Sequence, residues 1–256
     1  MIRQGDDMVD RLFSEPDLAA LYDSWWSQGP RSDFDFYLPL VMSAQAVLDA
    51  GCGTGALLHA ARDRGHTGRL CGLDPAAAML AQARRRPDIE WVLGRLTESR
   101  WAREFDLIVM TGHAFQVLTE DDEIRASLAA VRRALTDRGR FVFETRNPLA
   151  RAWEAWLPEN AVEVISAAGV KVRITTQVDA PFDGRTVSFT HTFASPLWDQ
   201  PQLSRTTLRF LDADSLSLFL AAAGLQIEEQ FGDWKRHPLT GTSPEIITIA
   251  RRFARV

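Results

Sequence analysis

The stretch VLDAGCGTG at residues 47–55 decides the fold of this chain. An apolar strand ends in the acidic residue Asp49, and glycines follow at the alternate positions Gly51, Gly53 and Gly55. Glycine allows a positive φ and lets a ligand approach the backbone where a Cβ would otherwise stand. The pattern predicts a strand-to-helix turn at the carboxyl edge of a sheet, where α/β folds bind nucleotide-like ligands. A tight turn without a ligand is the competing interpretation, and it would lose chain entropy with nothing gained in packing.

Strands and helices alternate from residue 46 to residue 147. Short apolar runs predict strands at residues 46–50, 69–74, 89–94, 105–111 and 140–145. Between the last two, apolar residues recur at helical spacing at positions 124, 128, 131 and 135. We expect Asp121 or Asp122 to cap the start of this helix and Gly139 to mark its exit. Such an order is typical of a parallel sheet with crossover helices.

The pattern changes after Pro148. Apolar and polar residues alternate, as in antiparallel strands with one face in solvent, at residues 163–165, 170–178, 186–194 and 203–210. A leucine-rich helix and two further strands then continue the first sheet, at residues 214–223, 226–231 and 246–250. Before residue 45, an amphipathic stretch predicts a helix laid over an apolar surface, through Leu18, Leu21, Tyr22, Trp25 and Trp26.

Composition narrows the class of protein. Of the 256 residues, 46% are hydrophobic and 25% charged, as in ordinary folded domains. The net charge of -5 gives no general attraction to nucleic acid, so no nucleic-acid partner is expected. No apolar run approaches the roughly 18 to 20 residues of a membrane span, so we expect a cytoplasmic protein without a membrane contact. Cys52 and Cys71 are too few for a disulfide framework or a four-ligand zinc site, and no metal is expected.

Asp74 ends the second expected strand, and Pro75 is expected to start the following helix. The two carboxylate oxygens of Asp74 could accept hydrogen bonds from both hydroxyls of a ribose. The alternative is that Asp74 only caps the helix ahead of the proline.

The turn also satisfies the loose dinucleotide pattern G-x-G-x-x-A from Gly51 to Ala56, with Asp74 at the expected distance. Electrostatics distinguishes a dinucleotide from S-adenosylmethionine as the ligand of this turn. A pyrophosphate would meet the carboxylate of Asp49, whereas S-adenosylmethionine brings an ammonium and a sulfonium that an acid attracts. Asp49 therefore favours adenosylmethionine. At the ends of the third and fourth strands, further contacts to its adenine and methionine parts are expected from Gly94, Arg95, Leu96, Thr111 and Gly112.

In this order the motifs resemble those of the class I S-adenosylmethionine-dependent methyltransferases over most of the chain, and the glycine turn carries the resemblance. It implies that Asp74 holds the ribose ahead of a helix bearing Met79. It also implies that the methionine part of the donor is surrounded by Asp49, Ala50, Gly51, Cys52, Gly53 and Gly55. One departure is Arg95-Leu96, because family members often have an acid there that meets the adenine amino group, and Arg95 cannot accept that hydrogen bond.

The resemblance implies an α/β fold with a doubly wound, mostly parallel seven-stranded sheet. Its C-terminal strand, at residues 245–250, would be antiparallel, and an antiparallel β-sheet would be inserted after the fifth strand. The segment at residues 35–37 and the insertion resemble the small-molecule branch, which includes glycine and amino-sugar N-methyltransferases, and in which N-terminal helices and the insertion roof the substrate. We therefore divide one compact domain into a helical lid, a donor-binding core and a substrate-covering sheet, at residues 1–45, 46–150 with 212–256, and 151–211.

The function implied is methyl transfer to a small-molecule acceptor at nitrogen, oxygen or carbon, with S-adenosylhomocysteine as the product. Two alternatives remain at this point: a nicotinamide-dependent oxidoreductase that uses the same turn, and a non-catalytic adenosylmethionine-binding protein without an enclosed acceptor cavity. The sequence is compatible with a monomer or a homodimer.

Methyl transfer from a sulfonium needs the acceptor lone pair held roughly 3 Å from the methyl carbon, so positioning and water exclusion supply much of the rate. A hydroxyl, acidic carbon or ammonium acceptor also needs a base. His113 is the first candidate because it follows the strand nearest the donor, and His191 in the insertion is the second. His113 could instead order its loop or bind the donor's carboxylate, and His191 could lie on a solvated strand face.

Aromatic and polar residues complete the predicted site. Tyr22 and Trp26 are expected over the sulfonium, because an aromatic face attracts a cation, or else as plain core contacts. Arg146 and Asn147 leave the fifth strand at the ligand-binding edge and could meet an anionic or carbonyl group of the acceptor, although Asn147 also begins a turn sequence. Other residues expected at the acceptor, or in ordinary packing, are Tyr37, Trp153, Trp156 and Trp198.

Overall fold

The first strand, β1 (Ala46–Ala50), sends successive side chains into two different cores. Val47 packs with the apolar residues of helices α4 (Ser32–Ser43) and α5 (Ala56–Asp63), whereas Leu48 packs with those of α7 (Asp121–Ala134) and α8 (Ala213–Ala222). Because successive strand residues point to opposite faces, a continuous apolar run needs helices on both sides. The computed structural model describes residues 9–26, 32–166 and 169–253.

The main sheet has seven strands in the order β10-β11-β5-β4-β1-β2-β3. Besides β1 it contains β2 (Arg69–Asp74), β3 (Glu90–Leu93), β4 (Phe105–Met110), β5 (Leu135–Arg146), β10 (Leu225–Phe231) and β11 (Glu245–Arg252). Strand β11 runs antiparallel to both of its neighbours, and the other pairs are parallel. This confirms the predicted doubly wound sheet with its C-terminal antiparallel strand. Because β1 lies between β2 and β4, the strand order reverses there and opens a ligand-binding crevice at the carboxyl ends of these strands.

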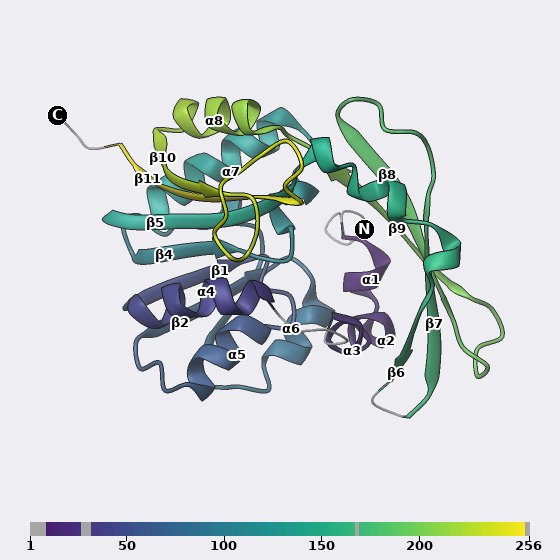
Figure 1. The fold of residues 1–256 in the computed structure, drawn as a ribbon. Helices are drawn as coiled ribbons and strands as arrows, with labels where there is room; N and C mark the ends of the chain where they lie inside the picture. Colours follow the sequence, from purple (N-terminus) through teal and green to yellow (C-terminus); the bar gives the residue numbers. More distant parts are fainter. Residues whose placement is uncertain (1–8, 27–31, 167–168, 254–256) are drawn as a thin grey trace, which may run out of the picture.

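The insertion forms a separate four-stranded antiparallel sheet, as predicted (Figure 1). Its strands are β6 (Val162–Ile165), β7 (Lys171–Val178), β8 (Thr186–Ala194) and β9 (Gln202–Arg209). Alternate residues of β7 are buried and exposed at its start, because one face packs on an apolar cluster and the other meets solvent. After the insertion the chain returns through α8 (Ala213–Ala222) to the main sheet.

Three short N-terminal helices lie between the two sheets in Figure 1: α1 (Arg11–Ser14), α2 (Pro16–Ala19) and α3 (Tyr22–Trp26). Hydrogen bonds attach the first of them to β9, since the Leu12 N–H donates to Ser204 Oγ at 2.8 Å and Thr206 Oγ1 donates to Asp10 at 2.6 Å. The other side packs on α6 (Ala77–Ala83). The division into lid, core and covering sheet stays a prediction, but these contacts place the N-terminal segment where a lid would lie.

Several element boundaries differ from those expected. Helix α7 (Asp121–Ala134) is capped by Glu120 rather than by Asp121 or Asp122, and it ends before Leu135. Gly139 therefore lies inside β5, where an added Cβ would be 2.8 Å from the Phe105 carbonyl oxygen. Pro75 precedes α6 instead of starting it. No described helix is long and apolar enough to cross a membrane.

Candidate active site

The glycine turn between β1 and α5 has the conformation that its residues predict. Gly51, Gly53 and Gly55 have φ values of 81°, 54° and 76°, a region that other residues rarely adopt. The Gly51 N–H donates to the Leu73 carbonyl at 2.8 Å and so fixes the turn to β2. A Cβ on Gly55 would overlap the Trp91 ring, so this glycine serves the packing of α5 rather than ligand contact.

Asp74 joins this turn to the start of α6. Its Oδ2 accepts a hydrogen bond from the Gly53 N–H at 2.8 Å, and its Oδ1 accepts one from the Ala76 N–H at 2.8 Å. The side chain therefore orders local backbone, as the alternative interpretation expected. Each carboxylate oxygen retains further acceptor capacity, so a ribose contact remains compatible with these bonds.

A cavity of about 620 Å³, here called the turn cavity, lies over this edge of the sheet. That volume is in the range of cofactor sites. The predicted donor-binding residues that line it are Tyr22, Gly51, Gly53, Asp74, Pro75, Met79, Arg95, Thr111 and Gly112. The structure therefore gathers residues from five separate segments of the prediction around one space.

Asp49 lies beneath the turn and is 1% exposed. Burial, together with the nearby carboxylates of Asp74 and Glu144, raises the pKa of Asp49 to about 8. Its Oδ1 has no hydrogen-bond partner among the described residues. Without a cation nearby Asp49 is thus mostly protonated at pH 7, which corrects the expectation of a standing negative charge at this position.

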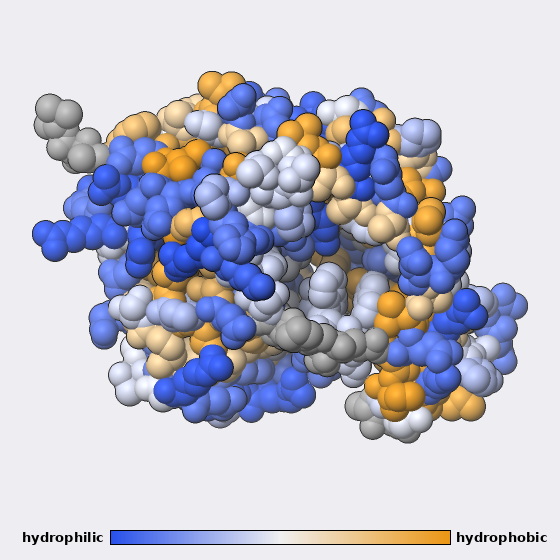
Figure 2. Space-filling view, in the orientation of Figure 1, coloured by the Kyte–Doolittle hydropathy of each residue, from blue (hydrophilic) through white to orange (hydrophobic). Residues whose placement is uncertain are grey.

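A second cavity of about 230 Å³, here called the aromatic cavity, adjoins the turn cavity. Both are lined by Phe13, Tyr22, Gly112 and Val117. Four more rings line the aromatic cavity, from Trp25, Trp26, Trp156 and Phe189. Its polar lining residues are His113, Arg146, Thr176, His191 and Thr206. On the face shown in Figure 2 the surface is hollowed where the N-terminal helices meet the two sheets.

His113 follows β4 and lines the aromatic cavity with φ of 62°, an unusual value for a residue other than glycine. Its backbone N–H donates to Glu144 at 2.8 Å, and its Nε2 lies 3.0 Å from Glu245 Oε2. Opposite a carboxylate, Nε2 carries a hydrogen, so in the neutral imidazole Nδ1 is the acceptor. Nδ1 is buried without a partner among the described residues. His113 is therefore held in the tautomer that a base requires, and it also orders its loop.

His191 lines the same cavity from β8 instead of facing solvent. Its Nδ1 lies 2.9 Å from Thr176 Oγ1, and its ring meets Trp25 edge-on at 4.9 Å between centroids. Burial, together with the charge of Arg146, lowers the pKa of His191 to about 4. The imidazole is neutral at pH 7 and a weak base, so His113 is the stronger of the two candidates.

Three residues expected at the acceptor have other surroundings. Tyr37 is 0% exposed and donates to Glu144, so it supports the loop of His113 from within the core. Asn147 is buried, and its amide donates to the Thr240 and Ser243 carbonyls. Trp198 packs with the cluster around Leu12 and lines neither cavity. The sequence places aromatic and polar residues near the ligand-binding edge of the sheet, but it does not determine which way their side chains point.

Some predicted donor contacts also lie outside the turn cavity. Leu96 is buried in the main core, Cys52 packs with Leu80 and Trp91, and Trp26 lines only the aromatic cavity. The residues behind the lining surface are Asp49, Ala50, Gly55 and Gly94.

The carboxylates of Glu144 and Glu245 were absent from the prediction. Glu144 lies inside β5 and Glu245 at the start of β11, and antiparallel pairing of these strands brings both to His113. Since 132 residues separate His113 from Glu245, no local spacing could have signalled the contact. Gln116, which accepts a hydrogen bond from Arg146, was also absent from the prediction. Among the described residues no cluster of His, Cys, Asp and Glu could hold a metal ion.

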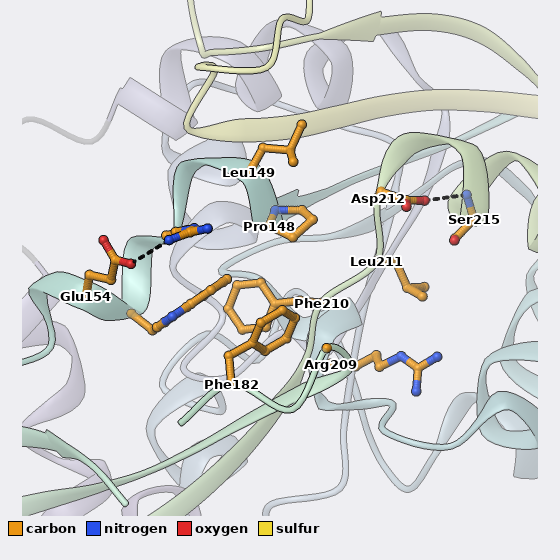
Figure 3. Close-up of a pocket in the computed structure, with 12 residues that line it drawn as sticks. Pro148, Leu149, Glu154, Phe182, Arg209, Phe210, Leu211, Asp212 and Ser215 are labelled. Atoms are coloured by element: carbon orange, nitrogen blue, oxygen red, sulfur yellow. Dashed lines mark hydrogen bonds and ion pairs between the residues drawn. The ribbon is translucent and has the colours of Figure 1, made fainter. Parts of the chain in front are cut away.

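A larger cavity of about 700 Å³ lies between the 3-10 turns after β5 and the start of α8 (Figure 3). Phe182 and Phe210 lie side by side at its centre. Charged side chains in its lining already have partners within the protein. Arg151 forms an ion pair with Glu154, and Asp212 accepts a hydrogen bond from the Ser215 N–H at the start of α8. Of the predicted site residues only Trp153 lines it, packed against Phe182 and Phe210, so size alone does not identify the functional cavity.

Known proteins resemble this chain in sequence and fold. The family model described as "Methyltransferase domain" matches residues 47–139. Malonyl-[acyl-carrier protein] O-methyltransferase of Anoxybacillus flavithermus is 28% identical over 54% of this chain, and the match spans about half, 52%, of that relative. Trans-aconitate 2-methyltransferase of Shigella flexneri is 25% identical over 82% of this chain and 87% of its own. The CcbJ methyltransferase from Streptomyces caelestis has a TM-score of 0.74 at 20% identity, covering 94% of this chain and 99% of that one.

The chain contains a methyltransferase domain at residues 47–139, and the relatives and solved structures that it resembles are class I S-adenosylmethionine-dependent methyltransferases. The fold of this methyltransferase is that of solved members, one of which has adenosylmethionine bound. Adenosylmethionine is the cofactor of the family. The nicotinamide-dependent alternative receives no support from these comparisons.

The turn cavity of this methyltransferase fits that cofactor. A Cβ on Gly51 would come within 2.8 Å of Ala114 Cβ, so the turn keeps open a cradle that any other residue would crowd. The unpartnered buried oxygen of Asp49 beneath it is suited to a cationic ligand. Among the lining residues, Asp74 has acceptor capacity for ribose hydroxyls, and Met79 and Pro75 supply apolar surface.

The raised pKa of Asp49 predicts a pH-dependent stability. A carboxyl group with a pKa near 8 in the folded protein and near 4 in the unfolded chain stabilises the fold fully below pH ~4 and loses that contribution as pH rises to about 8. We expect Asp49→Asn to gain stability over the wild type by up to ~1.4 kcal/mol per pH unit between those limits. Urea unfolding of the ligand-free proteins from pH 5 to 9 measures the difference.

Asp183→Asn is the matched control for this series. Backbone N–H groups of Thr186 and Arg185 lower the pKa of Asp183, so it is ionised in both states above pH ~6. The difference in unfolding free energy between Asp183→Asn and the wild type should be constant from pH 6 to 9. If the difference in unfolding free energy between Asp49→Asn and the wild type is also constant over this range, the raised pKa of Asp49 is contradicted.

Proposed function

We propose that this methyltransferase transfers the methyl group to a small molecule bound in the aromatic cavity, at a nitrogen, oxygen or carbon atom, by in-line displacement. The observation that carries the proposal is the contact between the two cavities, which share the lining residues Phe13, Tyr22, Gly112 and Val117. A donor in the turn cavity and an acceptor in the aromatic cavity would meet at this shared boundary.

The size of the aromatic cavity, about 230 Å³, favours a small acceptor over a macromolecule. The name of one relative, trans-aconitate 2-methyltransferase, also points to a small molecule. An acceptor cavity beside the donor site counts against a non-catalytic adenosylmethionine-binding protein. From composition we further propose a cytoplasmic location and no nucleic-acid or membrane partner, as monomer or homodimer.

The chain's own residues would act by positioning, water exclusion and proton removal. Bound adenosylmethionine supplies a methyl group on a sulfonium. The rings of Tyr22 and Trp26, 5.9 Å apart, exclude water and offer aromatic faces to a cation. His113 Nδ1 would accept a proton from the acceptor, while Glu245 stabilises the resulting imidazolium through Nε2. Asp74 would orient the ribose, and the N-terminal helices with the small sheet would cover both cavities.

Calorimetric titration and a methyl-transfer screen test this function. We expect adenosylmethionine and S-adenosylhomocysteine to bind with micromolar dissociation constants, and nicotinamide adenine dinucleotide to show no binding. Transfer of a radiolabelled methyl group to one member of a panel of small amines, alcohols and acids would support the acceptor proposal. Binding of the dinucleotide alone would refute it.

A further inference from the structure

Arg146, the last residue of β5, is the only lysine, arginine, aspartate or glutamate among the described residues that line the aromatic cavity. The other lining groups are aromatic, apolar, hydroxyl-bearing or imidazole. An arginine side chain stays charged in proteins. The cavity therefore presents a positive charge that no acidic side chain on its own wall offsets.

The guanidinium is held in place without being neutralised. Its Nη1 donates to Gln116 Oε1 at 3.1 Å, and its Cζ lies 5.4 Å from the centre of the Trp156 ring. Gln116 is itself fixed, because its Nε2 donates to the Arg209 carbonyl at 2.8 Å. Among the residues that the structure describes, Arg146 forms no ion pair. These contacts orient the planar group and leave other donors of its fork available.

The nearest carboxylates are committed elsewhere. Glu245 pairs with His113 Nε2, and Glu144 accepts from the Tyr37 hydroxyl and from the His113 N–H. Burial lowers the pKa of Arg146, whereas these two carboxylates raise it from a distance. A mostly buried guanidinium with no ion-pair partner is costly, and a ligand anion would relieve that cost.

We propose that the acceptor is a small molecule with an apolar or aromatic body and an anionic group, most simply a carboxylate, which Arg146 binds. This inference rests on the proposed role of the aromatic cavity as the acceptor site. A carboxylate matches the planar fork of a guanidinium, and the rings of Trp25, Trp156 and Phe189 would contact the body of the molecule. An acceptor with a cation at that position would instead be repelled.

Tryptophan fluorescence can test this binding, because Trp25, Trp26 and Trp156 line the cavity. The probes are phenylacetate and its neutral isostere phenylacetamide, titrated into the full chain saturated with S-adenosylhomocysteine. We expect the wild type to bind phenylacetate at least ~10-fold more tightly than phenylacetamide, since a charge-assisted hydrogen bond is stronger than a neutral one. Equal affinities, or no binding of phenylacetate, would overturn the inference.

Three variants attribute the preference to Arg146. Arg146→Met should lose it, and Arg146→Lys should keep part of it because the charge remains without the fork. Arg173→Met removes the same charge from an exposed position of β7 and should leave the preference unchanged. A preference that persists in Arg146→Met contradicts the assignment.

Titration of each protein with S-adenosylhomocysteine separates the possible failures. A variant that binds it normally is folded, so a lost preference then belongs to the aromatic cavity. If the wild type itself does not bind S-adenosylhomocysteine, the proposed function fails first. If the wild type binds S-adenosylhomocysteine normally but binds phenylacetate and phenylacetamide equally, only the proposal of an anionic acceptor fails.

Discussion

Replacing His113 by asparagine is expected to lower the rate of methyl transfer by ~10²–10⁴-fold while the affinity for adenosylmethionine stays nearly unchanged. The imidazole is the base candidate with a fixed tautomer, since Glu245 Oε2 lies 3.0 Å from Nε2 and Nδ1 has no described partner. Asparagine is the suitable replacement because it tolerates the φ of 62° at this position. Single-turnover rates with the acceptor from the screen measure the loss.

Glu245→Gln tests the positioning of that base. The amide cannot stabilise an imidazolium as a carboxylate does, so the imidazolium gives up its proton more readily in this variant. We expect kcat to fall by less than in His113→Asn and the ascending limb of its pH profile to move to lower pH. A purely structural role would change stability and leave the pH profile in place. A rate within a few-fold of the wild type in His113→Asn would contradict the base assignment and point to an acceptor that is already ionised.

Replacing Asp74 by alanine is expected to weaken adenosylmethionine and S-adenosylhomocysteine binding by at least ~100-fold. The carboxylate holds the Gly53 and Ala76 N–H groups at 2.8 Å, and it lines the turn cavity where ribose hydroxyls would meet it. Each hydrogen bond to a charged group contributes roughly 1.5–3 kcal/mol, so losing ribose contacts and turn geometry together has a large effect. Calorimetric titration of both ligands measures it.

The matched control for this variant is Asp212→Ala. Asp212 accepts from the Ser215 N–H at 2.7 Å as the cap of α8, and it lies outside both the turn and the aromatic cavities. The Asp212→Ala variant should lose ~1 kcal/mol of unfolding free energy and bind S-adenosylhomocysteine normally. An Asp74→Ala protein that binds like this control would show that Asp74 serves only as a cap.

Much of the fold could be predicted because its signals are local. Apolar runs of strand length and the alternate glycines at residues 51–55 do not depend on distant contacts. The errors fell at boundaries such as Gly139, where close approach to the Phe105 carbonyl, and not the end of a helix, requires glycine. Charge at such sites is equally non-local, since the protonation of Asp49 depends on burial and on two other carboxylates.

The sequence by itself determined the order of strands, the glycine turn, the place of Asp74 and the family that these motifs resemble. Only the tertiary structure decided that Tyr37 lies in the core, that Glu245 meets His113 and that Arg146 is the one lysine or arginine among the described residues lining the aromatic cavity. The physical reason is that a motif depends on neighbours in the chain, whereas burial and pairing depend on how distant strands such as β5 and β11 pack together.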